Sequence, residues 1–153
     1  MWLRLRLLAL LAGLLAGSLH AATDPKPGRY DRVDIAPTQT SIYIGSVSMT
    51  MPTFERKGIV YEADYTAKVF PYFFYSEHGR LFIEVSDEAL HRLARGEPIE
   101  FTGRGVSGGG TIRHVEGRAV PANATTGKIK VRVFVSRKIQ LIFNTTYTFV
   151  GPP

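Results

Sequence analysis

The chain has 153 residues, a formal charge of +6, 44% apolar residues and no cysteine. This length predicts one domain, and the absence of cysteine excludes disulfide bonds and cysteine-ligated metal sites. Fifteen glycines and nine prolines favour a structure with many turns over one built from long helices.

Residues 1–22 have the pattern of a secretory signal peptide. Arg4 and Arg6 precede an apolar run over Leu7–Leu15, and small residues end the segment. The apolar run is shorter than the ~20 residues that a membrane-spanning helix needs, so we expect cleavage rather than the alternative, an uncleaved N-terminal anchor. The sequence therefore predicts an exported protein, located in the periplasm or outside the cell.

Residues 23–38 predict an extended N-terminal arm. Pro25, Pro27 and Pro37 remove backbone hydrogen-bond donors and interrupt regular structure. A short strand around Val33 is expected near the end of this arm. Residues 39–150 then form a single all-β domain.

Alternating apolar residues predict the strands of this domain. Residues 128–135 and 139–149 alternate with period 2 around a short basic turn, which predicts a hairpin. The longest alternation covers residues 59–69, with apolar side chains on one face and mostly charged ones on the other. Residues 39–51 also alternate, but their phase changes at Gly45, which we interpret as a β-bulge within one strand.

One short helix is expected over Ser86–Arg95. Ser86 is a suitable N-cap, and Asp87 favours the positive end of the helix dipole. Leu90 and Leu93 lie on the same face. Because a helix of this length is not stable alone in water, we expect these leucines to close one open end of the β structure.

The complete pattern is eight or nine short strands at spacings near ten residues, with one short helix. It predicts an all-β fold, an antiparallel β-sandwich or, as the alternative, a small barrel. A parallel α/β architecture is excluded because no helices are available to connect parallel strands.

Residues 70–75 read Phe-Pro-Tyr-Phe-Phe-Tyr, more aromatic rings than one face of a strand can bury. We interpret them as a core strand covered by a second layer, because large aromatic residues are usually buried. The alternative is an exposed aromatic platform that binds a sugar, a lipid or another protein. Its candidate ligand-binding residues are Tyr72, Phe73, Phe74 and Tyr75.

Basic residues predominate in the last third of the chain, where Lys130 and Arg132 alternate with valines and so share the solvent-facing side of a strand. Such a face suits an anionic envelope component, a lipid, lipopolysaccharide or polysaccharide, or another envelope protein. Nucleic acid is not expected as the partner of an exported protein. The alternative is ordinary surface charge that keeps the protein soluble and protects a sheet edge.

The sequence offers no convincing catalytic or metal-binding set. The segment Gly105–Gly109 matches the G-x-S-x-G pattern of serine hydrolases, but a strand follows it and the required acid and histidine are in the wrong order. Glu62 and Asp64 share a strand face, which is ordinary for solvated charges. Histidines at metal-binding spacing are absent.

We therefore predict a non-enzymatic binding or accessory domain without cofactor or metal, acting through its aromatic or basic surface. The alternatives are a small outer-membrane β-barrel and a lipid-binding β-barrel with an interior cavity.

Overall fold

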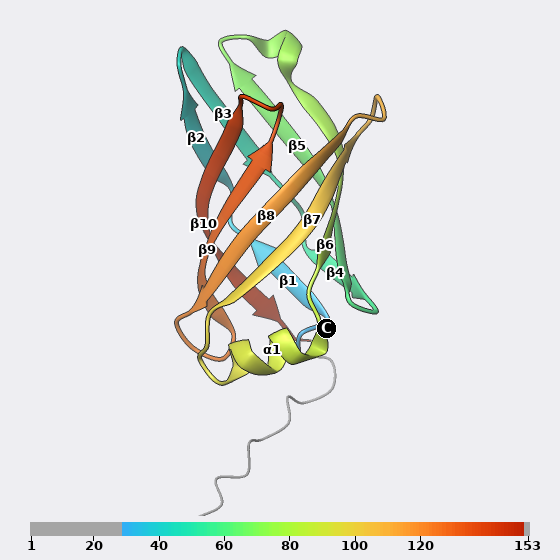
Figure 1. The fold of residues 1–153 in the computed structure, drawn as a ribbon, viewed down its shortest axis with the longest axis vertical. Coiled ribbons are helices and arrows are strands. Elements are labelled where there is room, and N and C mark those ends of the chain that lie inside the picture. The colour runs from blue at the N-terminus through green and yellow to red at the C-terminus, as the bar shows by residue number, and fades with distance from the viewer. Residues whose placement is uncertain (1–28, 152–153) are drawn as a thin grey trace, which may run out of the picture.

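The computed structural model describes residues 29–151, which form an antiparallel β-barrel with one α-helix at one end (Figure 1). The predicted signal peptide, residues 1–22, and the first part of the predicted arm lie outside the described residues. The strands are β1 (Arg32–Ile35), β2 (Thr38–Ile42), β3 (Gly45–Thr50), β4 (Phe54–Lys57), β5 (Val60–Phe70), β6 (Glu77–Glu84), β7 (Ile99–Ser107), β8 (Ile112–Pro121), β9 (Thr126–Phe134) and β10 (Gln140–Val150). The helices are the 3₁₀ turn η1 (Phe73–Tyr75) and α1 (Asp87–Ala94).

The sheet closes into an eight-stranded barrel. From β5 to β10 each strand pairs with the next, and β10 pairs with β1. Each of the two remaining barrel strands is divided into two segments. β1 and β2 form one of these strands, interrupted at Pro37, and β3 and β4 form the next, interrupted at Pro52. β1 pairs with β4 and β2 with β3, and both β3 and β4 pair with β5. Proline has no N–H to donate to the hydrogen-bond ladder, so Pro37 and Pro52 each divide a barrel strand into two short segments.

The expected β-sandwich is wrong, and the barrel alternative is correct. In a sandwich the outer strands of each sheet keep unpaired edges, whereas here the first and last strands pair in register from Arg32↔Val150 to Ile35↔Tyr147. This pairing satisfies the edges that a sandwich would leave exposed. Alternation cannot separate the two folds, because both have strands with one buried and one solvent-facing side.

Residues 38–50 form a hairpin rather than the single bulged strand that we expected. β2 and β3 pair antiparallel around the two-residue turn Tyr43-Ile44, and this reversal of the chain changes the phase of the alternation. Gly45 has φ of +114°, a backbone conformation that side-chain-bearing residues rarely adopt. A methyl group there would collide with the carbonyl oxygen of Phe70, so glycine allows the hairpin to lie against the end of β5.

The apolar faces of the strands point into the barrel. On β5, Tyr61, Ala63, Tyr65 and Ala67 are buried. Glycine also shapes the interior: Phe101 of β7 lies opposite Gly117 of β8, where a methyl group would collide with its ring. Gly117 thus provides the space that the ring occupies, in the pairing of large and small residues that fills narrow barrels.

Helix α1 covers one end of the barrel, as predicted (Figure 1). The Ser86 hydroxyl accepts a hydrogen bond from the Ala89 N–H at 3.2 Å and caps the helix. Leu90 and Leu93 are only 4% and 5% exposed and pack into the barrel core. Arg56 of β4 donates to the Asp87 carboxylate at 2.8 Å and holds the start of the helix on the barrel. Within residues 29–151, no helix is long and apolar enough to cross a membrane.

Candidate functional site

An apolar cavity of about 110 Å³ lies inside the barrel and extends to α1. Leu90 and Leu93 close it at the helix end, and inward side chains of the strands form its walls. Apart from Thr38 and Thr145, the residues that line it are apolar or aromatic. A cavity of this kind stays dry and favours apolar ligands, because it offers water few hydrogen-bond partners.

The inward face of β9 gives independent evidence that the interior is not completely filled. Ile129, Val131 and Val133 point inward and line the cavity, yet each remains partly exposed. In contrast, Val115 and Phe143 of the neighbouring strands are fully buried. Atoms next to a void lose the contacts that a close-packed interior provides, so β9 offers surface that a bound apolar group would cover.

Two tyrosines at the helix end of the barrel are almost completely buried. Burial raises the pKa of Tyr147 to about 12. Burial likewise raises the pKa of Tyr61, whose hydroxyl donates to the Tyr30 carbonyl oxygen. Both phenols therefore stay neutral at physiological pH and add aromatic rather than charged surface to the cavity lining.

A cluster of three polar side chains, which we call the polar collar, lies between the cavity and the other end of the barrel. It consists of Tyr65 on β5, Glu77 on β6 and Arg113 at the start of β8. Arg113 binds Glu77 through two hydrogen bonds, Nη2 to Oε2 at 2.9 Å and Nε to Oε1 at 3.1 Å. The Tyr65 hydroxyl donates to Oε1 at 2.8 Å. Arg113 also donates to the Val135 carbonyl oxygen at 3.4 Å, which joins the collar to the end of β9.

The collar is held in one charge state by these contacts. The hydrogen bond from the Arg113 guanidinium keeps the pKa of Glu77 below its ordinary value, so the carboxylate is ionised at neutral pH. Burial, together with the neighbouring Glu77, raises the pKa of Tyr65. Because the pair is already bidentate, a ligand carboxylate would have to displace Glu77 to bind Arg113. The collar therefore offers a ligand carboxylate no free cationic partner and suits a neutral ligand better than an acid.

Apolar side chains are concentrated at the end of the barrel opposite α1. Of the twelve exposed large hydrophobic residues among those described, nine lie there. Seven of them come from the β2–β3, β5–β6 and β9–β10 connections, and an eighth, Phe70, is the last residue of β5. We call these eight the aromatic rim: Tyr43, Ile44, Phe70, Tyr72, Phe73, Phe74, Tyr75 and Ile139. The ninth, Ile112, begins β8 beside them.

Four of the six predicted site residues, Tyr72–Tyr75, lie in the rim. They do not form the buried core strand that we expected, and they match the alternative of an exposed aromatic segment. Phe73–Tyr75 forms η1, and its side chains are exposed. A strand cannot continue here because the chain must turn between β5 and β6. Ser76 fixes the turn by accepting a hydrogen bond from the Val69 N–H at 3.0 Å. The ring centroids of Phe74 and Tyr75 are 4.5 Å apart. The binding role predicted for these residues stays a prediction.

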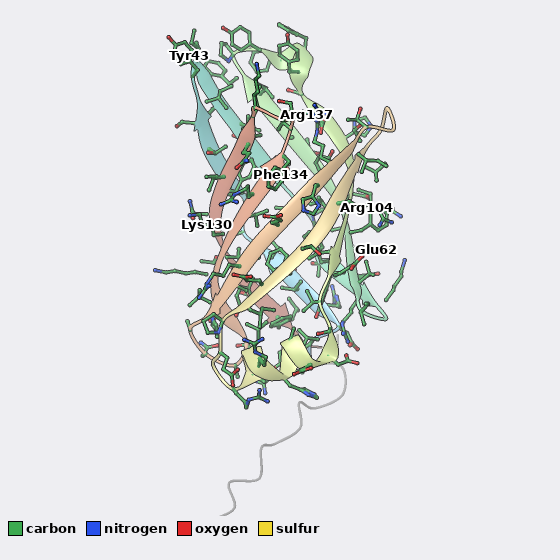
Figure 2. All side chains as sticks on the ribbon, viewed as in Figure 1. Tyr43, Glu62, Arg104, Lys130, Phe134 and Arg137 are labelled. Carbon is green, nitrogen blue, oxygen red and sulfur yellow. The ribbon has the colours of Figure 1, made fainter. Side chains whose placement is uncertain are left out.

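Lys130 and Arg132 lie elsewhere, on the outer wall of β9. Arg132 is 3.8 Å from the Glu116 carboxylate of β8, and Lys130 pairs in register with Arg118. Figure 2 shows Lys130 on the wall, whereas Tyr43 and Arg137 lie at the rim end. The structure therefore does not bring the predicted aromatic and basic groups into one site.

The groups considered for catalysis have other contacts. The Ser107 hydroxyl accepts a hydrogen bond from the Thr111 N–H at 3.0 Å and stabilises the β7–β8 turn. Glu62 and Asp64 form separate ion pairs with Lys57 and Arg80. Within residues 29–151, no three metal-binding side chains lie close together. The predicted absence of enzymatic activity stays a prediction.

The chain matches no family model, no curated protein and no solved structure. The cavity, the collar and the rim are therefore the features of the molecule that bear on its function. Sequence reasoning missed Tyr43, Ile44 and Ile139 in the rim, and Glu77 and Arg113 in the collar. Two consecutive apolar residues immediately before Gly45 were a signal for an exposed turn at the first of these places.

Proposed function

We propose that this protein is an exported binding module that takes a small apolar molecule, or part of an acyl chain, into the barrel interior. The observation that carries the proposal is the apolar cavity of about 110 Å³. Its size suits a single small ring or a few methylene groups, since an apolar cavity of ~150 Å³ binds benzene. Export is supported by the pattern of residues 1–22.

The distribution of charge supports this proposal over a transmembrane barrel. A barrel in the outer membrane exposes an apolar band ~25 Å tall to lipid and keeps a polar interior. Here the arrangement is reversed. On β5, Tyr61 and Tyr65 point inward, whereas Glu62, Asp64 and Lys68 lie on the outer face. An outer wall with these charges is suited to water.

A fluorescent probe displacement assay tests the proposal. The chain, as it is recovered from an expressing bacterium, is first analysed by native mass spectrometry for a bound small molecule. It is then titrated with N-phenyl-1-naphthylamine, and palmitoleic acid and its methyl ester are used as competitors. We expect saturable probe binding, with the neutral ester displacing the probe better than the acid because the collar holds a carboxylate already.

A matched pair of variants connects binding to the cavity. Ala119→Leu adds side-chain volume at a residue that lines the cavity, and Val120→Leu enlarges its outward-facing neighbour by a smaller amount. We expect the first to weaken probe binding and the second to leave it unchanged. If Ala119→Leu does not fold, Val131→Phe fills the same cavity from β9. A protein without a bound molecule and without saturable probe binding would contradict the proposal.

A further inference from the structure

The aromatic rim is a protruding surface rather than a pocket. It is formed by the tips of separate connections at the open end of the barrel (Figure 1). Tyr43, at the tip of the β2–β3 turn (Figure 2), is fully exposed, at 101% of its reference area. Its aromatic groups nevertheless have a defined arrangement. The ring centroids of Phe70 and Phe73 are 5.8 Å apart, and those of Tyr72 and Phe74 are 6.0 Å apart. Both pairs are packed edge to face. Exposed aromatic surface on this scale marks a contact with something apolar.

The charges near the rim have one sign. Among the connections at this end, the turns around Tyr43, η1 and Ser107 carry no charge, and the β9–β10 turn carries Arg137 and Lys138. None of these connections contains an acidic residue. Glu77, the nearest carboxylate inside the barrel, is bound to Arg113. The rim therefore combines aromatic and branched apolar groups with uncompensated positive charge.

This combination fits the boundary between the hydrocarbon and the headgroups of an anionic bilayer. Tyrosine and other aromatic side chains prefer that depth, where the ring is in apolar surroundings and the polar atoms reach water. Lysine and arginine next to them attract anionic headgroups. We propose that the aromatic rim is a contact surface for a lipid bilayer with anionic headgroups. The proposal rests on the rim and goes beyond the ligand proposed for the cavity.

The outer wall limits the depth of insertion. Below the rim, β5 and β6 carry the exposed Asp64–Arg80 ion pair, at 3.0 Å, and β7 carries Arg104 on its outer face. These groups would lose hydration if the barrel entered the hydrocarbon layer. The protein therefore stands on the membrane with its open end toward the lipid and α1 facing away. In this orientation, the collar and cavity lie directly behind the contact surface.

Vesicle co-sedimentation tests this orientation. The chain is mixed with vesicles of phosphatidylcholine alone and with vesicles of phosphatidylcholine and phosphatidylglycerol. We expect preferential binding to the anionic vesicles. The double variant Phe73→Ser/Phe74→Ser removes the aromatic contact, and Arg137→Gln/Lys138→Gln removes the charge. Each is expected to weaken binding at least about tenfold, since each basic residue near an anionic surface contributes roughly fivefold.

Matched variants of the wall serve as controls. Lys130→Gln/Arg132→Gln changes the net charge by the same amount away from the rim, and Val120→Ser removes an exposed apolar side chain at the α1 end. Both are expected to bind vesicles as the unaltered protein does. Equal losses for the wall and rim charge variants would overturn the proposal in favour of general electrostatic attraction. Absence of binding to anionic vesicles would also overturn it.

Light scattering tests the alternative binding partner of the rim, a second copy of the chain. If the unaltered protein is a dimer and Phe73→Ser/Phe74→Ser is a monomer, the rim is a self-association surface and the membrane proposal fails. The cavity is tested separately. Ala119→Leu is expected to keep vesicle binding, and the rim variants are expected to keep probe binding without vesicles. Failure at the rim is thus distinguishable from failure at the cavity.

Discussion

Apolar side chains are buried at one end of the barrel and exposed at the other. At one end, α1 covers the opening, and Leu90 and Leu93 are almost completely buried. At the other end no α-helix of residues 29–151 covers the opening, and Phe74 and Tyr75 remain 76% and 68% exposed. Residues of similar hydrophobicity therefore contribute to the free energy of folding at the first end only. At the second end their surface remains exposed to solvent, and exposed apolar patches of this kind commonly mark contact surfaces.

The largest expected effect is at the closed end. Leu93→Ala should lower the free energy of unfolding by about 2–5 kcal/mol, because it leaves a void where the helix packs on the barrel. Urea unfolding followed by circular dichroism measures the change. His91→Ala, on the exposed side of the same helix, serves as the control and should change stability by less than about 0.5 kcal/mol. Equal effects of the two substitutions would mean that α1 does not close the barrel through its leucines.

The polar collar lies between the two ends and should give an intermediate effect. Arg113→Met leaves the Glu77 carboxylate, whose side chain is 26% exposed, without its guanidinium partner. We expect a loss of about 1–3 kcal/mol in the free energy of unfolding. The control is Arg80→Met, which removes an exposed partner of Asp64 and should cost no more than about 1 kcal/mol. A double-mutant cycle with Glu77→Gln then isolates the coupling energy of the collar pair.

Acid titration of stability sharpens the assignment of that pair. Arg113 lowers the pKa of Glu77 in the folded state, so Glu77 contributes stability above its ordinary pKa of ~4.3, and this contribution is lost as the pH falls through the lower, folded-state value. Unfolding free energies of the unaltered protein and of Glu77→Gln should therefore converge as the pH falls below the ordinary carboxyl pKa of ~4.3.

The comparison with Glu77→Gln is needed because Glu97 has a similar shift. Its pKa is lowered by hydrogen bonds from Arg95 and Arg92, on and after α1. This contribution is present in both proteins and cancels in their difference. A difference in stability that does not change with pH would mean that Glu77 acts through packing rather than through its charge.

The smallest effect on stability is expected at the rim. Phe74→Ser removes a side chain that is mostly in water, so the free energy of unfolding should change by less than about 0.5 kcal/mol. The same substitution should weaken binding to vesicles that contain phosphatidylglycerol, because it removes aromatic surface from the rim. Urea unfolding and vesicle co-sedimentation measure the two effects. A large loss of stability would show that the rim supports the fold and would remove the contrast between the ends.

Period-2 alternation predicted the strands and their inward faces well, because burial of one face of a strand requires apolar residues at every second position. Tyr61 and Val131 point inward as expected, and Ser86 caps the helix as expected. The closure of the barrel was not predictable in this way, since the pairing of β1 with β10 depends on register between distant segments. The local hairpin at Tyr43 was misinterpreted because a turn and a bulge change the phase of alternation in the same manner.

The candidate site was predicted only in part. The aromatic segment at Tyr72–Tyr75 was conspicuous in the sequence, but its exposure depends on where the barrel ends. The polar collar was invisible, because Tyr65, Glu77 and Arg113 are far apart in the sequence and have ordinary neighbours. The cavity also has no local signature, since it results from the side-chain volumes of all the strands together.

The pairing of Arg32 with Val150 also constrains when the barrel can form. Neighbouring hairpins can assemble as soon as they are synthesised. The barrel strand formed by β1 and β2, however, keeps an unpaired edge until β10 is available. Contacts between such distant residues slow folding, because a long loop must close before the contact is made. The chain therefore cannot reach its final structure until nearly all of it has been synthesised.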